Sequence, residues 1–262
     1  MAGTLTQKVR SAYRLLRDEG VTRFGSALRS RASVKLGIYL RGRNKTVFLD
    51  GCRFELRGLP DTRMKLELLT GRYEQPERNA VRAYLPPDLP VVELGGCVGV
   101  VSCITNKVLK SPARHVVLEA NPLAIPHLTR NREVNGCDFK ILNRALAYDC
   151  RTVTFRPSPD LWGTSLDHNL SMEVPVITPS AQLSQILSEE GFDRYVLICD
   201  IEGYEYELVM REPEALRQAE LVIMELHPHM IGEDKVRVIL SEIQNLGFMT
   251  LDHSALVIVL SK

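Results

Sequence analysis

The run ELGGCVG at residues 93–99 follows a short apolar, β-branched segment and precedes a helical pattern. Glycines at such a turn let the backbone bend tightly and approach a ligand, because they carry no Cβ. Glu93 lies in an otherwise apolar strand end, where an unpaired carboxylate is costly. The cationic end of a ligand, or the N-terminus of the following helix, would satisfy it. The turn is a candidate ligand site, although glycine-rich strand-to-helix turns also occur for packing.

Glu119 is the last residue of the next apolar run, and Ala120-Asn121-Pro122 follow it. An acid at this point of a strand is placed to accept hydrogen bonds from both hydroxyls of a ribose. The alternative is that Glu119 only caps the following helix. Taken together with the glycine-rich turn, the pattern favours the ribose role.

A third segment, DIEGYE at residues 200–205, stands where another apolar run meets a helical pattern. Its three acids within six residues create a negative pocket that suits a cationic ligand such as a sulfonium. Helix capping is the alternative for Glu202 and Glu205, because the helix dipole favours acids in the first turn by about 0.3–1 kcal/mol. Asp200 is harder to explain by capping, since it ends the apolar run.

The fourth segment, ELH at residues 225–227, ends the apolar run after that. His227 can exchange a proton near neutral pH, so it is a candidate general base together with Asp200. A histidine considered alone is more often a structural hydrogen-bonding residue. Its place beside the other three segments gives the catalytic interpretation equal weight.

Alternating strand and helix patterns must position these four segments. We expect strands at 91–94, 115–119, 139–143, 194–200 and 219–226, and helices at 98–110, 121–134, 180–190, 203–218 with a break at Pro213, and 232–246. Strand–helix alternation predicts a parallel sheet, whose strand ends meet along one edge. The last two strands are joined by a turn at His253-Ser254, which is too short for a parallel crossover, so the final strand must run antiparallel.

The part of the chain before residue 76 has a different pattern. We expect an amphipathic helix over 4–19, a hairpin over 46–56 around Asp50-Gly51, and a short helix over 62–70, followed by another over 76–84. Residues 151–155 and 174–177 are predicted to be additional strands around a polar loop. We therefore divide the chain into a basic N-terminal helical arm with a hairpin extension, 1–75, and an α/β domain, 76–262.

Composition and charge limit the class of protein. The 262 residues are 45% hydrophobic and 25% charged, a globular balance, and no run approaches the roughly 18 apolar residues of a membrane span. An apolar leader is not evident and none of the six cysteines forms a CxxC pair, so we expect a cytoplasmic protein without a metal site.

Basic residues gather at the start of the chain. Residues 1–45 hold eleven Lys or Arg and two acids, a net charge of +9, which leaves −8 for the remainder. Such an arm could contact an acidic substrate, a partner or an anionic membrane surface. The alternative, slightly favoured by apolar residues at helical spacing, is an amphipathic helix that packs on the domain.

In order, these segments resemble the motifs of the FkbM family of methyltransferases. The match runs from about residue 70 to residue 230, and DIEGYE is its most specific part. The matching residues are Tyr73-Glu74, the run 93–99, Glu119 with Pro122, Asn143 with Ala145, Gly163 with Ser165, the run 200–205, and Glu225 with His227. Two segments depart from the family: Gly96-Cys97 replaces the usual Ala-Asn, and residues 178–181, TPSA, lack the acids of Thr-Leu-Asp-Asp.

The resemblance implies a Rossmann-like class I methyltransferase fold, with a mostly parallel seven-stranded sheet and an antiparallel C-terminal strand. It implies S-adenosyl-L-methionine as cofactor and O-methylation of a hydroxyl on a sugar or a polyketide-like or peptide-like natural product. The cofactor-binding residues would be Tyr73, Glu74, Glu93, Gly95, Gly96, Gly99, Glu119, Asn121, Asn143 and Ala145. The catalytic residues would be Asp200, His227 and Glu202, and the substrate-binding residues Trp162, Ser165 and Glu205.

Three other functions are compatible with parts of the pattern. An NAD(P)-dependent oxidoreductase would need the G-x-G-x-x-G spacing, which the glycine-rich turn lacks. A non-catalytic module could retain the fold for assembly, but the retained acids argue against it. Nucleic-acid methylation is not expected, because no N/D-P-P-Y/F motif is present and the basic arm alone is weak support. A small-molecule or glycan acceptor is the expected partner.

Overall fold

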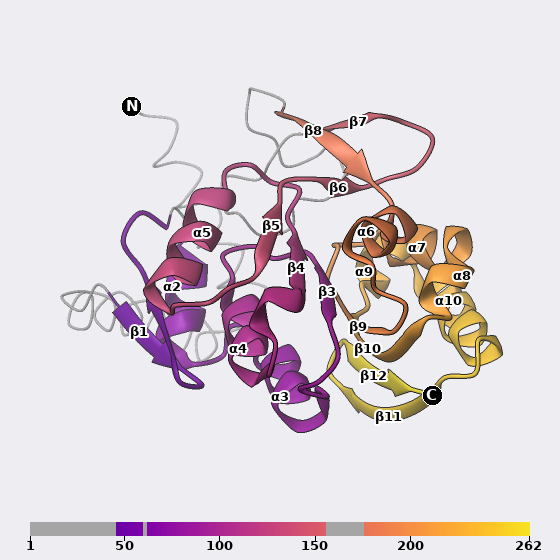
Figure 1. Ribbon diagram of the computed structural model, residues 1–262, viewed down its shortest axis with the longest axis horizontal. Helices are drawn as coiled ribbons and strands as arrows, with labels where there is room; N and C mark the ends of the chain where they lie inside the picture. The colour runs from indigo at the N-terminus through magenta and orange to yellow at the C-terminus, as the bar shows by residue number, and fades with distance from the viewer. Residues whose placement is uncertain (1–45, 60–61, 156–175) are drawn as a thin grey trace, which may run out of the picture. The chain divides into compact units, whose positions relative to one another are not determined.

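The computed structural model describes residues 46–59, 62–155 and 176–262 (Figure 1). Thr46–Lys262 forms one compact unit. Residues 1–45, which include the predicted helix over 4–19, lie outside the described residues. Trp162, Gly163 and Ser165 also lie outside them.

A seven-stranded sheet forms the centre of the unit, in the order β11-β12-β10-β9-β3-β4-β5. Five neighbouring strands, from β10 to β5, are parallel, while β12 is antiparallel to both β10 and β11. This order, in which the antiparallel strand β12 lies between β10 and the edge strand β11, is the class I methyltransferase arrangement. It confirms the predicted fold class. The strands are β3 (Val91–Leu94), β4 (His115–Leu118), β5 (Lys140–Leu142), β9 (Tyr195–Cys199), β10 (Ala219–Glu225), β11 (Met249–Ser254) and β12 (Val257–Ser261).

Apolar layers of helices cover both faces of the sheet, and its central strands are therefore buried on both sides. One face packs on α3 (Gln75–Tyr84), α4 (Val100–Val108) and α5 (Ile125–Val134), and the other on α6 (Leu183–Glu190), α7 (Glu205–Arg211), α8 (Pro213–Leu216) and α10 (Glu233–Asn245) (Figure 1). Within β3, Val91 faces the first layer and Val92 the second. The remaining short helices are α2 (Thr62–Thr70), η1 (Pro112–Arg114) and α9 (Pro228–Ile231).

The predicted hairpin is β1 (Thr46–Leu49) with β2 (Cys52–Glu55), joined through Asp50-Gly51 at positive φ angles of 47° and 83°. Its buried side chains, such as Phe54, share the apolar core of the α4 face. The expected division after residue 75 therefore differs from the compact unit, which begins at Thr46. The hairpin packs with the sheet domain because its own apolar face is too small to be buried alone.

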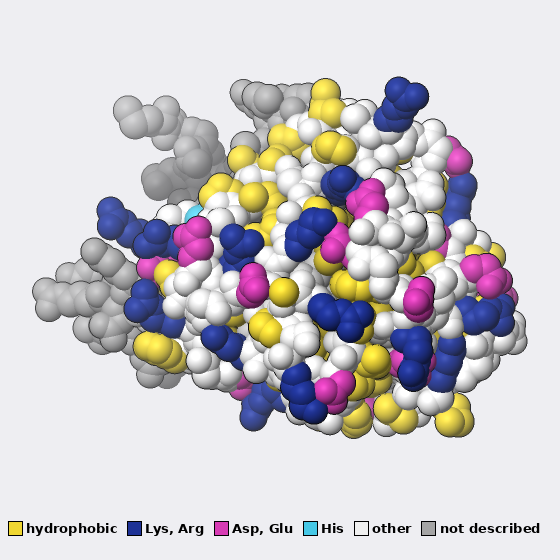
Figure 2. Space-filling model, viewed as in Figure 1, with side chains coloured by type: hydrophobic (Ala, Val, Ile, Leu, Met, Phe, Trp, Pro, Cys, Tyr) yellow, Lys and Arg dark blue, Asp and Glu magenta, His cyan; other side chains and the backbone are white. Residues whose placement is uncertain are grey.

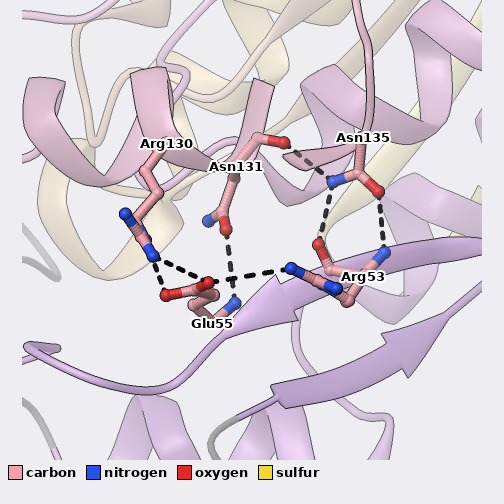
Figure 3. A network of polar contacts seen from close by, with 5 residues as sticks. All are labelled: Arg53, Glu55, Arg130, Asn131 and Asn135. Carbon is pink, nitrogen blue, oxygen red and sulfur yellow. Dashed lines mark hydrogen bonds and ion pairs between the residues drawn. The ribbon is translucent and has the colours of Figure 1, made fainter. Parts of the chain in front are cut away.

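Asn131 of α5 and Asn135, the C-cap residue after that helix, contact the edge of the hairpin (Figure 3). The Asn135 amide accepts from the backbone N–H of Arg53 and donates to its carbonyl, both at 2.8 Å, as a neighbouring strand would. Asn131 is buried, and its Oδ1 accepts from the N–H of Glu55 at 3.3 Å while its Nδ2 donates to the carbonyl of Val98 at 2.7 Å. Asn131 thus joins the hairpin, α5 and the glycine-rich turn.

A separate three-stranded sheet follows β5, in the order β6-β8-β7. Its strands are β6 (Ala145–Leu146), β7 (Thr152–Phe155) and β8 (Val176–Ala181). The expectation that a helix begins at residue 180 was wrong, because β8 continues to Ala181 in pairing with β6 and α6 begins only at Leu183. The final turn lies at Ala255-Leu256 rather than His253-Ser254, since β11 pairs as far as Ser254.

The described surface mixes both signs of charge. Figure 2 shows Lys and Arg side chains interspersed with Asp and Glu on the face in view. Several form ion pairs, such as Arg130–Glu55 and Arg194–Glu220, both at 2.7 Å or less. Every helix within the described ranges is too short or too polar to cross a bilayer.

We expect Asn131→Ala to lower the free energy of unfolding by about 2–3 kcal/mol, because it leaves a buried carbonyl and an N–H without partners. Urea unfolding followed by circular dichroism measures the change. The exposed helix residue Asn245 offers a matched control, and Asn245→Ala should change stability by less than about 0.5 kcal/mol. Equal effects of the two substitutions would contradict this role for Asn131.

Candidate functional site

The four sequence segments meet at one edge of the sheet. The neighbouring strands β10, β9, β3 and β4 are parallel, so their carboxyl ends lie side by side. Those ends carry Glu225 with His227, Asp200, the glycine-rich turn and Glu119 respectively. The fold therefore brings together the residues that the sequence places far apart.

Close packing shapes the glycine-rich turn. Gly95 has φ 92°, and a Cβ there would lie 1.7 Å from the carbonyl oxygen of Asp200. A Cβ on Gly96 would lie 2.4 Å from Val117, and one on Gly99 2.6 Å from Leu128. Each glycine is thus required by the protein's own packing, and direct contact of Gly95, Gly96 and Gly99 with a cofactor stays a prediction.

The Glu93 side chain is buried and has partners within the protein, so its cofactor role stays a prediction. Its side chain is 1% exposed; Oε1 accepts from the Ser102 hydroxyl at 2.5 Å and Oε2 lies 3.0 Å from Nε2 of His115. Strand alternation turns Glu93 toward α4, on the same face as Val91. The carboxylate is therefore satisfied within the core, and a cationic ligand is not needed to explain it.

The Glu119 carboxylate bridges two loops. Its Oε2 accepts from the backbone N–H of Cys97 and its Oε1 from that of Asn121, both at 2.6 Å. Burial raises the pKa of Glu119 to about 7, although the two N–H groups act in the opposite direction. Each carboxylate oxygen keeps a further lone pair, so hydroxyl donors can still bind.

Other predicted cofactor residues hold the loop after β4 in place. The Asn143 amide donates to the carbonyl of Glu119 at 2.8 Å, and the Thr178 hydroxyl donates to that of Ala120 at 2.9 Å. Oδ1 of Asn121 accepts from the N–H of Leu123 at 3.0 Å. Ala145 is buried within β6. Asn143, a predicted cofactor residue, and Thr178, which was not predicted, thus hold the backbone at Glu119 and Ala120 in place.

Tyr73 and Glu74 reach the site from the start of α3. The Tyr73 hydroxyl lies 3.3 Å from Sγ of Cys97 in the glycine-rich turn. Glu74 has φ 47° at the N-cap of α3, and burial, together with the charges of Glu77 and Asp200, raises the pKa of its carboxyl well above the usual range. Only the family resemblance pointed to this pair.

His227 is the centre of an acidic cluster. Its Nδ1 lies 2.9 Å from Oε1 of Glu205. Its Nε2 lies 3.5 Å from Oδ1 of Asp200, 3.4 Å from Oε2 of Glu202 and 3.9 Å from Oε1 of Glu225. Glu205 is completely buried and contacts His227 and the N–H of Gly203, and its contact with a substrate stays a prediction.

Burial and mutual repulsion control ionisation in this cluster. Burial and the Glu202 charge raise the pKa of Asp200 to about 8, against the opposing effect of His227. Burial and Asp200 raise the pKa of Glu225 to about 10. Burial lowers the pKa of His227, but its hydrogen bond to Glu205 and the charge of Asp200 prevail and raise it to about 9. All three pKa values are raised, so the cluster favours bound protons and cationic ligands.

Sequence reasoning missed Glu77. Its side chain is 6% exposed, and its charge raises the pKa values of both Glu225 and Asp200. It lies on α3, which packs against β10. The one available signal is an acid three residues after Glu74, on the same side of an amphipathic helix.

The chain was compared with known families, curated proteins and solved structures. No protein-family model matches the chain, and no curated protein matches its sequence. Among solved structures, it is similar to ribosomal protein L11 methylase from Lactobacillus delbrueckii subsp. bulgaricus (13% identity, 73% of this chain and 77% of that one, TM-score 0.43). It is also similar to a putative O-methyltransferase from Klebsiella pneumoniae (14%, 72% and 79%, TM-score 0.42).

A third similar structure is magnesium protoporphyrin IX methyltransferase from Synechocystis PCC 6803 with bound SAM (12% identity, 76% of this chain and 83% of that one, TM-score 0.44). At these identities and TM-scores the similarities carry no argument about activity. The fold assignment rests on the strand order of the sheet.

The raised pKa of Glu119 predicts a pH-dependent stability. Its folded carboxyl binds a proton more tightly than an unfolded one, whose pKa is about 4.5, so the wild type should lose stability as pH rises from about 4.5 to 7. Glu119→Gln does not titrate. The free energy of unfolding of this variant, measured relative to that of the wild type, should therefore increase by up to about 3 kcal/mol as the pH is raised from 5 to 8.

Urea unfolding at both pH values measures this difference. Any loss from the poorer hydrogen bonds of Gln is the same at both pH values and cancels. Glu233→Gln, at an exposed position, is the control and should follow the wild type. A constant offset between Glu119→Gln and wild type across this range would contradict the prediction.

Proposed function

We propose that the chain is an S-adenosylmethionine-dependent methyltransferase that O-methylates a hydroxyl of a sugar or natural-product acceptor. One observation carries the proposal: the glycine-rich turn, Glu119 and the His227 cluster occupy adjacent strand ends of a sheet with the methyltransferase strand order. Ligands of open α/β sheets bind at that edge.

The donor and acceptor groups at this edge fit the cofactor. Glu119 keeps lone pairs for the hydroxyls of a ribose, as expected from its place at the end of β4. The glycine-rich turn and Tyr73-Glu74 would hold the methionine portion. The surplus of carboxylates around His227 suits a positively charged sulfonium, which supplies the methyl group when the cofactor is bound.

The same cluster would hold the acceptor hydroxyl. Asp200 and Glu202 lie 3.5 and 3.4 Å from Nε2 of His227, so a single acceptor oxygen could contact all three side chains. Alignment of the hydroxyl with the methyl group would supply much of the catalysis. Asp200 and His227 are the candidates for receiving the hydroxyl proton, and Glu202 would orient the acceptor.

Cofactor binding is the first test. The protein should bind S-adenosylhomocysteine in isothermal titration calorimetry, and Glu119→Ala should weaken binding by about 1–3 kcal/mol through loss of charge-assisted hydrogen bonds. Glu233→Ala is the matched control and should bind like the wild type. Heat of binding with NAD instead would support the oxidoreductase alternative and overturn the proposal.

Turnover is the second test. Methyl transfer from labelled S-adenosylmethionine to a panel of glycosides and natural-product alcohols should identify an acceptor. On that acceptor, Asp200→Asn should lower the single-turnover rate by about 10²-fold or more, because the amide preserves shape without the basic oxygen. Its affinity for S-adenosylhomocysteine should change far less. A wild-type rate in this variant would remove Asp200 from the reaction.

A further inference from the structure

Three side chains at the carboxyl ends of β9 and β10 place possible metal-ligand atoms close together. One possible ligand atom from each of Asp200, Glu202 and His227 lies within 4.8 Å of the other two. The histidine nitrogen is 3.5 Å and 3.4 Å from the two oxygens. Donor atoms that share one cation at about 2.1 Å stand roughly 3–4 Å apart. The two distances from the histidine nitrogen thus fall within the range expected for ligands around a single ion.

Glu205 orients the histidine for such a role. Its fully buried carboxylate lies 2.9 Å from Nδ1 of His227, so this nitrogen carries the proton and donates it to Oε1. Metal binding would displace the second proton, on Nε2, whose lone pair would then be directed at the ion beside Asp200 and Glu202. A carboxylate that holds the far nitrogen of a histidine is a common feature of metal sites, because it sets the tautomer and the ring orientation.

Unsatisfied oxygens supply an independent observation. Within the described chain, Oδ1 of Asp200, Oε2 of Glu205 and Oε2 of Glu77 are buried and lack a hydrogen-bond partner. Glu77 is itself 6% exposed and lies beside Glu225. No Lys or Arg of the described ranges pairs with these carboxylates. Buried carboxylate oxygens without donors are costly, and a cation would compensate them.

We propose that Asp200, Glu202 and His227 bind one divalent transition-metal ion, with Glu205 as a positioning residue. Two carboxylates and one imidazole suit Mn²⁺ better than Mg²⁺, which prefers oxygen ligands alone, and differ from the Cys and His sets of structural zinc. Three protein ligands leave positions on the ion for water. That one of these positions takes the acceptor hydroxyl rests on the proposed function.

Mn²⁺ binding to the full chain tests the site directly. The EDTA-stripped protein, without cofactor, is titrated with Mn²⁺ while electron paramagnetic resonance measures the free ion. We expect saturable binding of one Mn²⁺ per chain. Asp200→Asn and His227→Ala should each weaken it by at least about tenfold. Glu207→Gln, on the exposed side of α7, is the matched control and should bind like the wild type.

Two further variants keep the test decisive if a core substitution unfolds the protein. The Glu202 side chain is 33% exposed, so Glu202→Gln should fold normally and still bind Mn²⁺ at least about tenfold more weakly. Glu205→Gln should weaken binding while retaining the nitrogen hyperfine coupling of a histidine ligand, and His227→Ala should lose that coupling.

The proposal is overturned if no saturable binding occurs below about 1 mM Mn²⁺, or if Glu202→Gln and Glu207→Gln bind Mn²⁺ equally well. S-adenosylhomocysteine titrated into the EDTA-treated protein reports on the methyltransferase function separately. Mn²⁺ binding without S-adenosylhomocysteine binding would retain the metal site and reject the methyltransferase. The reverse result would do the opposite.

Discussion

Carboxylates buried where parallel strands end impose the main constraint on this molecule, since each loses its hydration and must find donors within the protein. Glu93 finds Ser102 and His115. Glu119 finds two backbone N–H groups. Away from the strand ends, Glu212 between α7 and α8 accepts from the N–H groups of Leu183 and Ser184, both at 2.7 Å, and so caps the N-terminus of α6. In each case the carboxylate joins segments that are distant in the chain.

The His227 cluster departs from this pattern. Among the described residues, six carboxylates surround or adjoin one imidazole and no Lys or Arg pairs with them, and three of their buried oxygens have no donor there. A site with such an excess of negative charge is stable only if a cation compensates it or if some of its carboxyls hold protons. The same excess that makes the cluster unfavourable by itself makes it selective for cationic ligands.

Packing around the glycine-rich turn connects this cluster to the cofactor side of the site. Because Gly95 has no side chain, its Cα can stand against the carbonyl of Asp200, so the turn after β3 and the end of β9 are held together. Cys97 in the same turn contacts both Tyr73 and Glu119. Asn131 then joins the turn to α5 and the hairpin. The site is therefore supported by elements from both ends of the described chain.

The sequence by itself determined the order of strands and helices, the hairpin at Asp50-Gly51, the antiparallel last strand and the four segments at the carboxyl ends of the strands. Each of these follows from a local pattern of apolar residues, from glycines or from the length of a turn. Only the tertiary structure decided which way each carboxylate points. Glu93 faces the core, Glu205 lies beneath His227, and Glu77 enters the cluster from α3, because helix packing selects among side-chain environments that a linear pattern does not distinguish.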